Sequence, residues 1–145
     1  MKVAVSACLV GKNTKYNGKN NYNEAVMKYL QNKEYVTICP EVIGGLPTPR
    51  VPSERKDNKV INKIGEDVTI NFFDGAQKEI EKLLKENINI IIVKEKSPSC
   101  GYKQIYDGSF AGKIIEGNGV FTELAVKNGM QILTEKDIEN KKFAD

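Results

Sequence analysis

Three cysteines are the residues whose chemistry and spacing stand out in this 145-residue chain. Cys8, Cys39 and Cys100 are separated by 31 and 61 residues, and the chain contains no histidine. An odd number of thiols cannot pair completely within one chain, and the sequence has no CxxC motif. A structural zinc site with four ligands is disfavoured, because one thiolate is missing and no imidazole can replace it.

Three thiolates that meet at one place could hold a soft metal centre. Soft sulfur ligands favour iron–sulfur clusters, Cu(I) or zinc. A cubane cluster normally takes four cysteines, so a cluster with three would keep one iron open, as catalytic metals do. Two other interpretations stay open at this point: one reactive cysteine served by two resolving thiols, and three cysteines that pack as small apolar residues.

The elements that would position these thiols follow from the hydrophobic pattern. Short β-branched or aliphatic runs predict strands over residues 3–8, 35–39, 88–93 and 131–133. Helical spacing of apolar residues predicts helices over residues 23–30, 69–86, 120–128 and 137–142, the last capped by Thr134. We expect a single α/β domain over residues 1–145, with a mostly parallel sheet between helices in a Rossmann-like three-layer arrangement.

This fold would bring the three cysteines together. Each cysteine stands at or shortly after the end of a predicted strand, and the separations are close to one and two βαβ units of roughly 30 residues. The carboxyl ends of parallel strands share one edge, where such sheets bind ligands. Two segments rich in Gly, Pro and Asn, residues 11–22 and 44–66, are expected to be irregular, and the second is long enough to favour a functional role.

Composition excludes several classes of function. Twenty-two basic against nineteen acidic residues leave a net charge of +3, which gives no indication of nucleic-acid binding. No stretch approaches the roughly 20 apolar residues of a membrane helix, and the N-terminal MKVAVSACLVGK is too short in its apolar part for a signal peptide. We expect a cytoplasmic protein without a membrane partner, with the monomer and the homodimer both open.

Candidate catalytic residues lie near the cysteines. Without histidine, acid–base chemistry must use other side chains, and Glu41 follows Cys39 by two residues. A solvated surface charge is the alternative for this glutamate. Ser97 and Ser99 flank Pro98, which restricts Ser97 to extended conformations. Such a loop could aim a hydroxyl at a ligand or could be an ordinary turn.

Ser99 and four further residues are candidates for substrate binding. Gly44 and Gly45 would permit close backbone approach, and Arg50 offers a planar group suited to bidentate recognition. A salt bridge is an equally good reading of Arg50, with Glu54, Glu66 or Asp67 as partner. Tyr16 could stack on a base, although core packing is common for tyrosine.

Long motifs identify a resemblance that covers nearly the whole chain. The motifs are VSACLVGKNTKYNG, CPEVIGGLPTPRVPSE, GEDVTINFFDGA, SPSCGYKQIYDGSFAG and GNGVFTELAVKNGM, in this order. Together they closely resemble the DUF523 family, which includes the thiouracil desulfurases. One departure is Asn17, where the family pattern leads us to expect Asp.

The resemblance implies an oxygen-sensitive [4Fe–4S] cluster held by Cys8, Cys39 and Cys100. The fourth iron would take the sulfur of a thiolated pyrimidine, and water would replace that sulfur in a C–S cleavage without net redox change. Glu41 and Ser97 would lie beside the substrate. Two alternatives remain at this stage: a redox or metal sensor, and sulfur transfer in tRNA thiolation.

Overall fold

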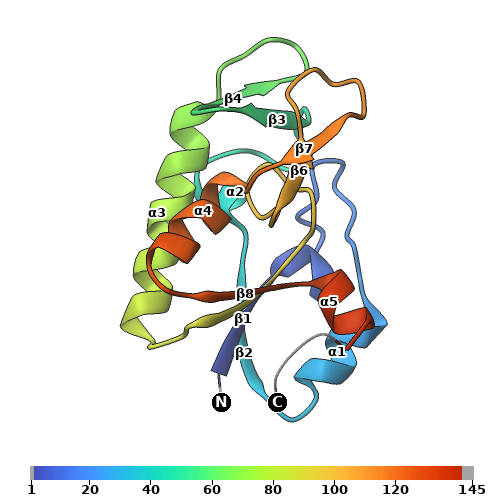
Figure 1. Cartoon of the computed structure of the whole chain (residues 1–145), viewed down its shortest axis with the longest axis vertical. Coiled ribbons are helices and arrows are strands. Elements are labelled where there is room, and N and C mark those ends of the chain that lie inside the picture. The colour runs from blue at the N-terminus through green and yellow to red at the C-terminus, as the bar shows by residue number, and fades with distance from the viewer. Residues whose placement is uncertain (1, 142–145) are drawn as a thin grey trace.

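A four-stranded parallel sheet forms the centre of the molecule (Figure 1). The computed structural model describes residues 2–141. Strands β1 (Lys2–Ser6), β2 (Glu34–Ile38), β5 (Ile90–Val93) and β8 (Gln131–Thr134) lie in the order β2-β1-β5-β8. All three pairings are parallel. The expected α/β class and parallel sheet are therefore confirmed.

Helices cover both faces of the sheet and make two apolar cores. α3 (Thr69–Lys85) and α4 (Val120–Lys127) pack on one face, where Ala4 and Ile91 belong to their core. α1 (Glu24–Leu30) and α5 (Glu135–Glu139) pack on the other, together with Val3 and Val5. Because successive side chains of a strand point to opposite faces, β1 contributes alternate residues to the two cores.

Local hydrogen bonds decide where the helices begin. The side chain of Asn23 accepts a hydrogen bond from the N–H of Val26 and caps α1. Thr134 and Asp137 form a capping box, so α5 begins at Glu135, two residues before the predicted start. The end of the predicted helix 137–142 lies partly outside the described residues. No helix among residues 2–141 is long and apolar enough to span a membrane.

Two short elements follow the strands that carry the first two cysteines. β1 ends at Ser6 and continues as the 3₁₀ helix η1 (Ala7–Val10), so the predicted strand 3–8 is two residues too long at this end and Cys8 lies within the turn. Cys39 follows β2 and is the N-cap of α2 (Pro40–Ile43). Both elements are too short to give a periodic sequence signal.

Two antiparallel hairpins lie beyond the carboxyl edge of the sheet, at the top of Figure 1. They are β3 (Ser53–Lys56) with β4 (Lys59–Asn62), and β6 (Gln104–Tyr106) with β7 (Ile114–Glu116). The expectation that residues 44–66 are irregular is wrong for the first hairpin, whose strands are short and largely polar. Oε1 of Glu54 accepts hydrogen bonds from the N–H groups of Gly108 and Phe110 and so joins the two hairpins.

Candidate metal centre and active site

All three cysteines line one cavity of about 590 Å³ at the carboxyl ends of the strands. Their mutual proximity also appears in their ionisation, because a charge on Cys39 raises the pKa of both Cys8 and Cys100. The convergence expected from the strand ends is therefore present. The cavity is also lined by Thr14, Tyr16, Asn21, Glu41, Glu54, Lys94, Ser97 and Ser99.

Cys8 is held by the segment that returns to it after η1. Its carbonyl accepts the backbone N–H of Asn21 at 2.9 Å, and its Sγ receives the side-chain N–H of the same residue at 3.4 Å. Burial raises the pKa of the Cys8 thiol, while the hydrogen bond from Asn21 and the nearby ammonium of Lys94 lower it. The side-chain N–H of Asn21 would therefore donate a hydrogen bond to the negatively charged sulfur of a metal-bound Cys8 thiolate.

Cys39 is positioned by α2 and by α3 behind it. Pro40 occupies the first turn of α2, where its missing N–H costs nothing, and the N–H of Cys39 donates to Oε2 of Glu79 at 2.7 Å. Burial raises the pKa of the Cys39 thiol most, and hydrogen bonds from the backbone of Val42 and the side chain of Thr14 oppose this.

Cys100 is the most buried of the three, at 5% exposure. Its N–H donates to Oγ of Ser97 at 3.0 Å, and its carbonyl accepts the hydroxyl of Thr122 at 2.7 Å. A Cβ on Gly119 would lie 2.5 Å from the backbone of Ser99, so glycine is required where α4 meets this loop. Burial raises the pKa of the Cys100 thiol well above its usual range.

The three thiols that line one cavity offer the soft sulfur donors that an iron–sulfur cluster takes. No group of three or more His, Cys, Asp or Glu side chains within residues 2–141 is arranged around one metal ion. Cys8, Cys39 and Cys100 would be the residues that hold such a cluster, whose usual ligands are cysteine thiolates. Burial disfavours three free thiolates together, and the positive charge of iron would remove this cost. Hydrogen bonds to the sulfurs are a further known feature of such sites.

Glu41 is held in the cavity by two partners. Its Oε1 forms an ion pair with Nε of Arg50 at 3.0 Å, and the two side chains are only 15% and 7% exposed. Its Oε2 accepts the hydroxyl of Ser99 at 2.8 Å. A carboxylate oxygen has two lone pairs, so each oxygen of Glu41 can still accept a proton or a water. The alternative of a solvated surface charge does not describe this residue.

Ser97 and Ser99 are joined to each other as well as to the site. Their hydroxyl oxygens lie 3.0 Å apart, and Oγ of Ser97 also accepts the N–H of Ser99 at 3.2 Å. The hydroxyl of Ser99, whose residue is 2% exposed, additionally lies 3.7 Å from Sγ of Cys100. Ser97 therefore shapes the turn and Ser99 contacts the Glu41 carboxylate, whereas a contact of either hydroxyl with a ligand stays a prediction.

Arg50 and Arg55 have mainly structural contacts. Besides Glu41, the guanidinium of Arg50 contacts the carbonyls of Thr14 and Pro47, so its partner is none of the three carboxylates expected. Arg55 is buried and joins the first hairpin to α4 through the carboxylate of Glu123. Direct substrate binding by Arg50 stays a prediction.

The remaining sequence candidates fall in different places. Tyr16 lines the cavity and is 41% exposed, as a residue that could stack on a ligand would be. Gly44 and Gly45 lie outside the cavity lining. A Cβ on Gly44 would be 2.1 Å from the carbonyl oxygen of Asn71 on α3, so this glycine permits helix contact. Asn17 accepts the N–H of Lys19 in an exposed turn. Substrate binding by the two glycines stays a prediction.

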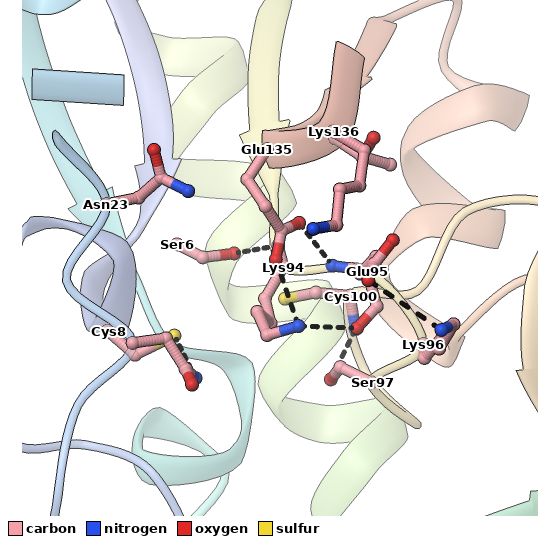
Figure 2. A network of polar contacts seen from close by, with 12 residues as sticks. Ser6, Cys8, Asn23, Lys94, Glu95, Lys96, Ser97, Cys100, Glu135 and Lys136 are labelled. Carbon is pink, nitrogen blue, oxygen red and sulfur yellow. Dashed lines mark hydrogen bonds and ion pairs between the residues drawn. The ribbon is translucent and has the colours of Figure 1, made fainter. Parts of the chain in front are cut away.

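A polar network lies beside the cysteines (Figure 2), and its pairing of Lys94 with Glu135 was not expected from the sequence. The ammonium of Lys94 lies 2.9 Å from Oε2 of the buried Glu135, whose Oε1 accepts the N–H of Glu95 at 2.7 Å. The N–H of Lys94 donates to Oγ of Ser6 at 3.1 Å. Figure 2 shows Cys100 close to Lys94 within this network and Cys8 to one side of it, and Lys94 lines the cavity with both cysteines. Glu135 is 41 residues from Lys94 in the sequence, so no local pattern could have indicated the pair.

Comparison with known proteins gives three matches. The pattern of the family "2-thiouracil desulfurase" matches residues 3–137. The uncharacterized protein YbbK of Bacillus subtilis (strain 168) is 36% identical over 148 residues, which cover 95% of this chain and 98% of YbbK. The solved structure of a [4Fe-4S]-dependent thiouracil desulfidase, TudS, superposes with a TM-score of 0.90 at 38% identity and covers 96% of this chain and 93% of that chain.

Proposed function

The chain belongs to the 2-thiouracil desulfurase family, and on this basis we propose that it replaces the thione sulfur of a thiolated pyrimidine base with oxygen from water. A [4Fe–4S] cluster bound by Cys8, Cys39 and Cys100 is the cofactor. The observation that supports this most is the meeting of these three cysteines with Glu41 in one cavity of about 590 Å³. The likeness to a [4Fe-4S]-dependent thiouracil desulfidase supports the same cofactor.

The overall reaction converts C=S and water into C=O and hydrogen sulfide. Both water protons leave with the sulfur, so the site needs a group that takes protons from water and returns them. When bound, the cluster supplies a soft Lewis acid with affinity for the thione sulfur. The protein must supply the base, the proton path and the shape of the cavity.

Glu41 is the proton acceptor in this proposal. It is the carboxylate nearest in sequence to a proposed ligand, and Arg50 and Ser99 fix one carboxylate oxygen each. Both contacts leave lone pairs free for a water aligned with the substrate carbon. A base whose position is fixed before the reaction loses no free energy to reorganisation in the transition state.

The two serines extend Glu41 into a proton path. A carboxylate can only accept, so the hydroxyl proton of Ser99 points to Oε2 of Glu41. Ser97 must then donate to Ser99 across the 3.0 Å contact. When Glu41 gains a proton from water, the direction of these bonds can reverse and carry a proton toward Ser97 and the cavity. In this path the hydroxyl of Ser99 relays protons between Glu41 and Ser97, a role that the turn itself does not require.

Turnover with and without the cluster tests this function. The protein is reconstituted with iron and sulfide under anaerobic conditions and mixed with 2-thiouracil or 4-thiouracil. We expect equal amounts of uracil and sulfide, with no reductant consumed. Equal turnover by metal-free protein would refute the cluster chemistry, and cluster-loaded protein that is inactive on both bases would refute the substrate class.

A further inference from the structure

Glu79 is a buried carboxylate that the proposed reaction does not use. It lies on α3, is 2% exposed and does not line the cavity. Charged side chains are almost never buried to this degree without a partner. Its contacts lead to the end of β2, where Cys39 begins the next element.

Two side chains of α3 bind the open edge of β2. Oε2 of Glu79 accepts the N–H of Cys39 at 2.7 Å, and the ammonium of Lys82 donates to the carbonyl of Thr37 at 3.1 Å. Strand β2 is at the end of the sheet order, so only one of its edges pairs with another strand. In an extended chain, alternate residues direct their backbone groups to the same side, which here is the side away from β1. Glu79 and Lys82 thus satisfy a donor and an acceptor that a further strand would otherwise bind.

Glu79 and Lys82 are also paired with each other. The ammonium of Lys82 lies 3.0 Å from Oε1 of Glu79. The direction of this contact does not meet hydrogen-bond geometry, and Oε1 has no other hydrogen-bond partner among the described residues. We regard the short distance as a Coulombic contact. The carboxylate therefore depends on the N–H of Cys39 for its best-formed hydrogen bond, and that N–H depends on the carboxylate.

The close approach of α3 to this strand end is built into the sequence. A Cβ on Gly75 would lie 1.9 Å from the carbonyl oxygen of Pro40, so only glycine permits the contact. Glu79 is one helical turn after Gly75, on the same face of α3. The backbone contact thus brings Glu79 within reach of Cys39, immediately before Pro40.

We propose that Glu79, supported by Lys82, is a positioning residue for the cluster ligand Cys39. It holds the backbone of Cys39 so that Sγ faces the cavity, and it fixes the start of α2, from which Glu41 projects. This inference rests on the proposed function for the identity of the cluster. It adds that retention of iron at Cys39 depends on a hydrogen bond from outside the cavity.

The experiment measures how fast a chelator removes iron from cluster-loaded variants. Glu79→Gln keeps an oxygen that can accept the N–H of Cys39, whereas Glu79→Leu removes it. We expect Glu79→Gln to lose iron within about 3-fold of the wild-type rate and Glu79→Leu to lose it at least about 10-fold faster, because a buried N–H is left without a partner. Amide hydrogen exchange of the metal-free proteins should accelerate at Cys39 in Glu79→Leu, with the β1 amides unchanged.

Matched controls separate positioning from general destabilisation. Ile80→Val and Leu83→Ala remove buried apolar atoms from α3, and together they bracket a mild and a large loss of stability. If Glu79→Leu loses iron no faster than a control of equal stability, the proposal is overturned. It is also overturned if Glu79→Gln is as labile as Glu79→Leu, because acceptance of the N–H would then be irrelevant.

The proposal can still be tested if Glu79→Leu does not fold or if the wild-type protein binds no cluster. Lys82 has a side chain that is 40% exposed, so Lys82→Met should fold even if Glu79→Leu does not. Iron loss from Lys82→Met at least about 3-fold faster than from wild type supports the proposal, since a hydrogen bond to the strand end is lost, and an unchanged rate contradicts it. If wild-type protein itself binds no cluster, the proposed function has failed, whereas the exchange rate at Cys39 still tests the hydrogen bond.

Discussion

The hydroxyl of Ser99 donates a hydrogen bond to Oε2 of Glu41 at 2.8 Å, although 58 residues separate these side chains in the sequence. Sheet topology creates this contact, because the parallel strands β2 and β5 end at the same edge of the sheet. Glu41 and Ser99 lie in the segments that follow these two strands. The contact places a fixed carboxylate beside the three cysteines.

Replacement of Glu41 by Gln should remove the base without removing the cluster. Gln keeps the shape and can still accept the hydroxyl of Ser99, but it cannot take a proton from water. We expect kcat for thiouracil to fall at least ~10²-fold, with iron per chain unchanged. Glu54→Gln is the matched control, since Glu54 lines the same cavity but accepts backbone N–H groups that Gln can also satisfy. A Glu41→Gln enzyme as active as this control would exclude the role of base.

The two serines should differ in what their loss affects. Ser99→Ala removes the donor to Glu41, and we expect about a 10-fold loss of kcat with iron content retained. Ser97→Ala also removes the acceptor for the N–H of Cys100, so cluster retention should fall together with kcat. Iron content and rate measured on both variants check this difference. Identical behaviour of the two variants would contradict the separate assignments.

Substitution of the two arginines should have different effects, on kcat for Arg50 and on the free energy of unfolding for Arg55. Arg50→Lys keeps a positive charge but loses the planar group that contacts Glu41 and the carbonyl of Thr14 together. We expect kcat to fall about 10-fold at constant iron content. Arg55→Lys should instead lower the free energy of unfolding by about 1–3 kcal/mol, with kcat of the folded protein unchanged. Chemical denaturation and steady-state kinetics on both variants provide the comparison.

Alkaline pH should destabilise the metal-free protein. Burial raises the pKa of all three thiols above the usual 9.0, most strongly at Cys100. Above about pH 9 the unfolded chain loses thiol protons that the folded protein keeps, so stability is complete below this pH and falls as pH rises through the folded pKa values. Denaturant unfolding between pH 7.5 and 10.5 measures the slope.

Two controls accompany the pH series. Cys100→Ala should show a shallower decline, since the most strongly shifted thiol is absent. Cluster-loaded protein should not show the thiol-linked decline in stability. Its cysteines are bound to iron as thiolates, so the folded protein holds no thiol protons at any pH of the series. Equal slopes for metal-free wild type and Cys100→Ala would contradict the assignment of the effect to Cys100.

Elements with a strong periodic signal were predictable from the sequence. The long α3 and the aliphatic β5 both bury a continuous apolar face, and their positions agree with the expected segments to within a few residues. The convergence of the cysteines followed from the three predicted strands 3–8, 35–39 and 88–93, since parallel strands end at one edge. The hairpins were missed because strands of only three or four residues are too short to show an alternating pattern.

The contacts that hold the site were not predictable. The partner of Arg50 is Glu41 rather than the carboxylates further along the loop, because the chain folds back beside α2. Glu79 reads as one more charge among the Lys and Glu residues of α3, and only tertiary packing brings it to Cys39. Long-range polar pairs of this kind have no fixed sequence spacing, so a single sequence gives no signal for them.

Iron-57 Mössbauer spectroscopy of the reconstituted protein tests the central claim most directly. With three cysteine ligands for four irons, we expect one iron in four to differ from the other three and to change its parameters when 2-thiouracil is added under anaerobic conditions. Four equivalent irons that do not respond to the base would contradict the open coordination position, and spectra without cluster iron would contradict the cofactor itself.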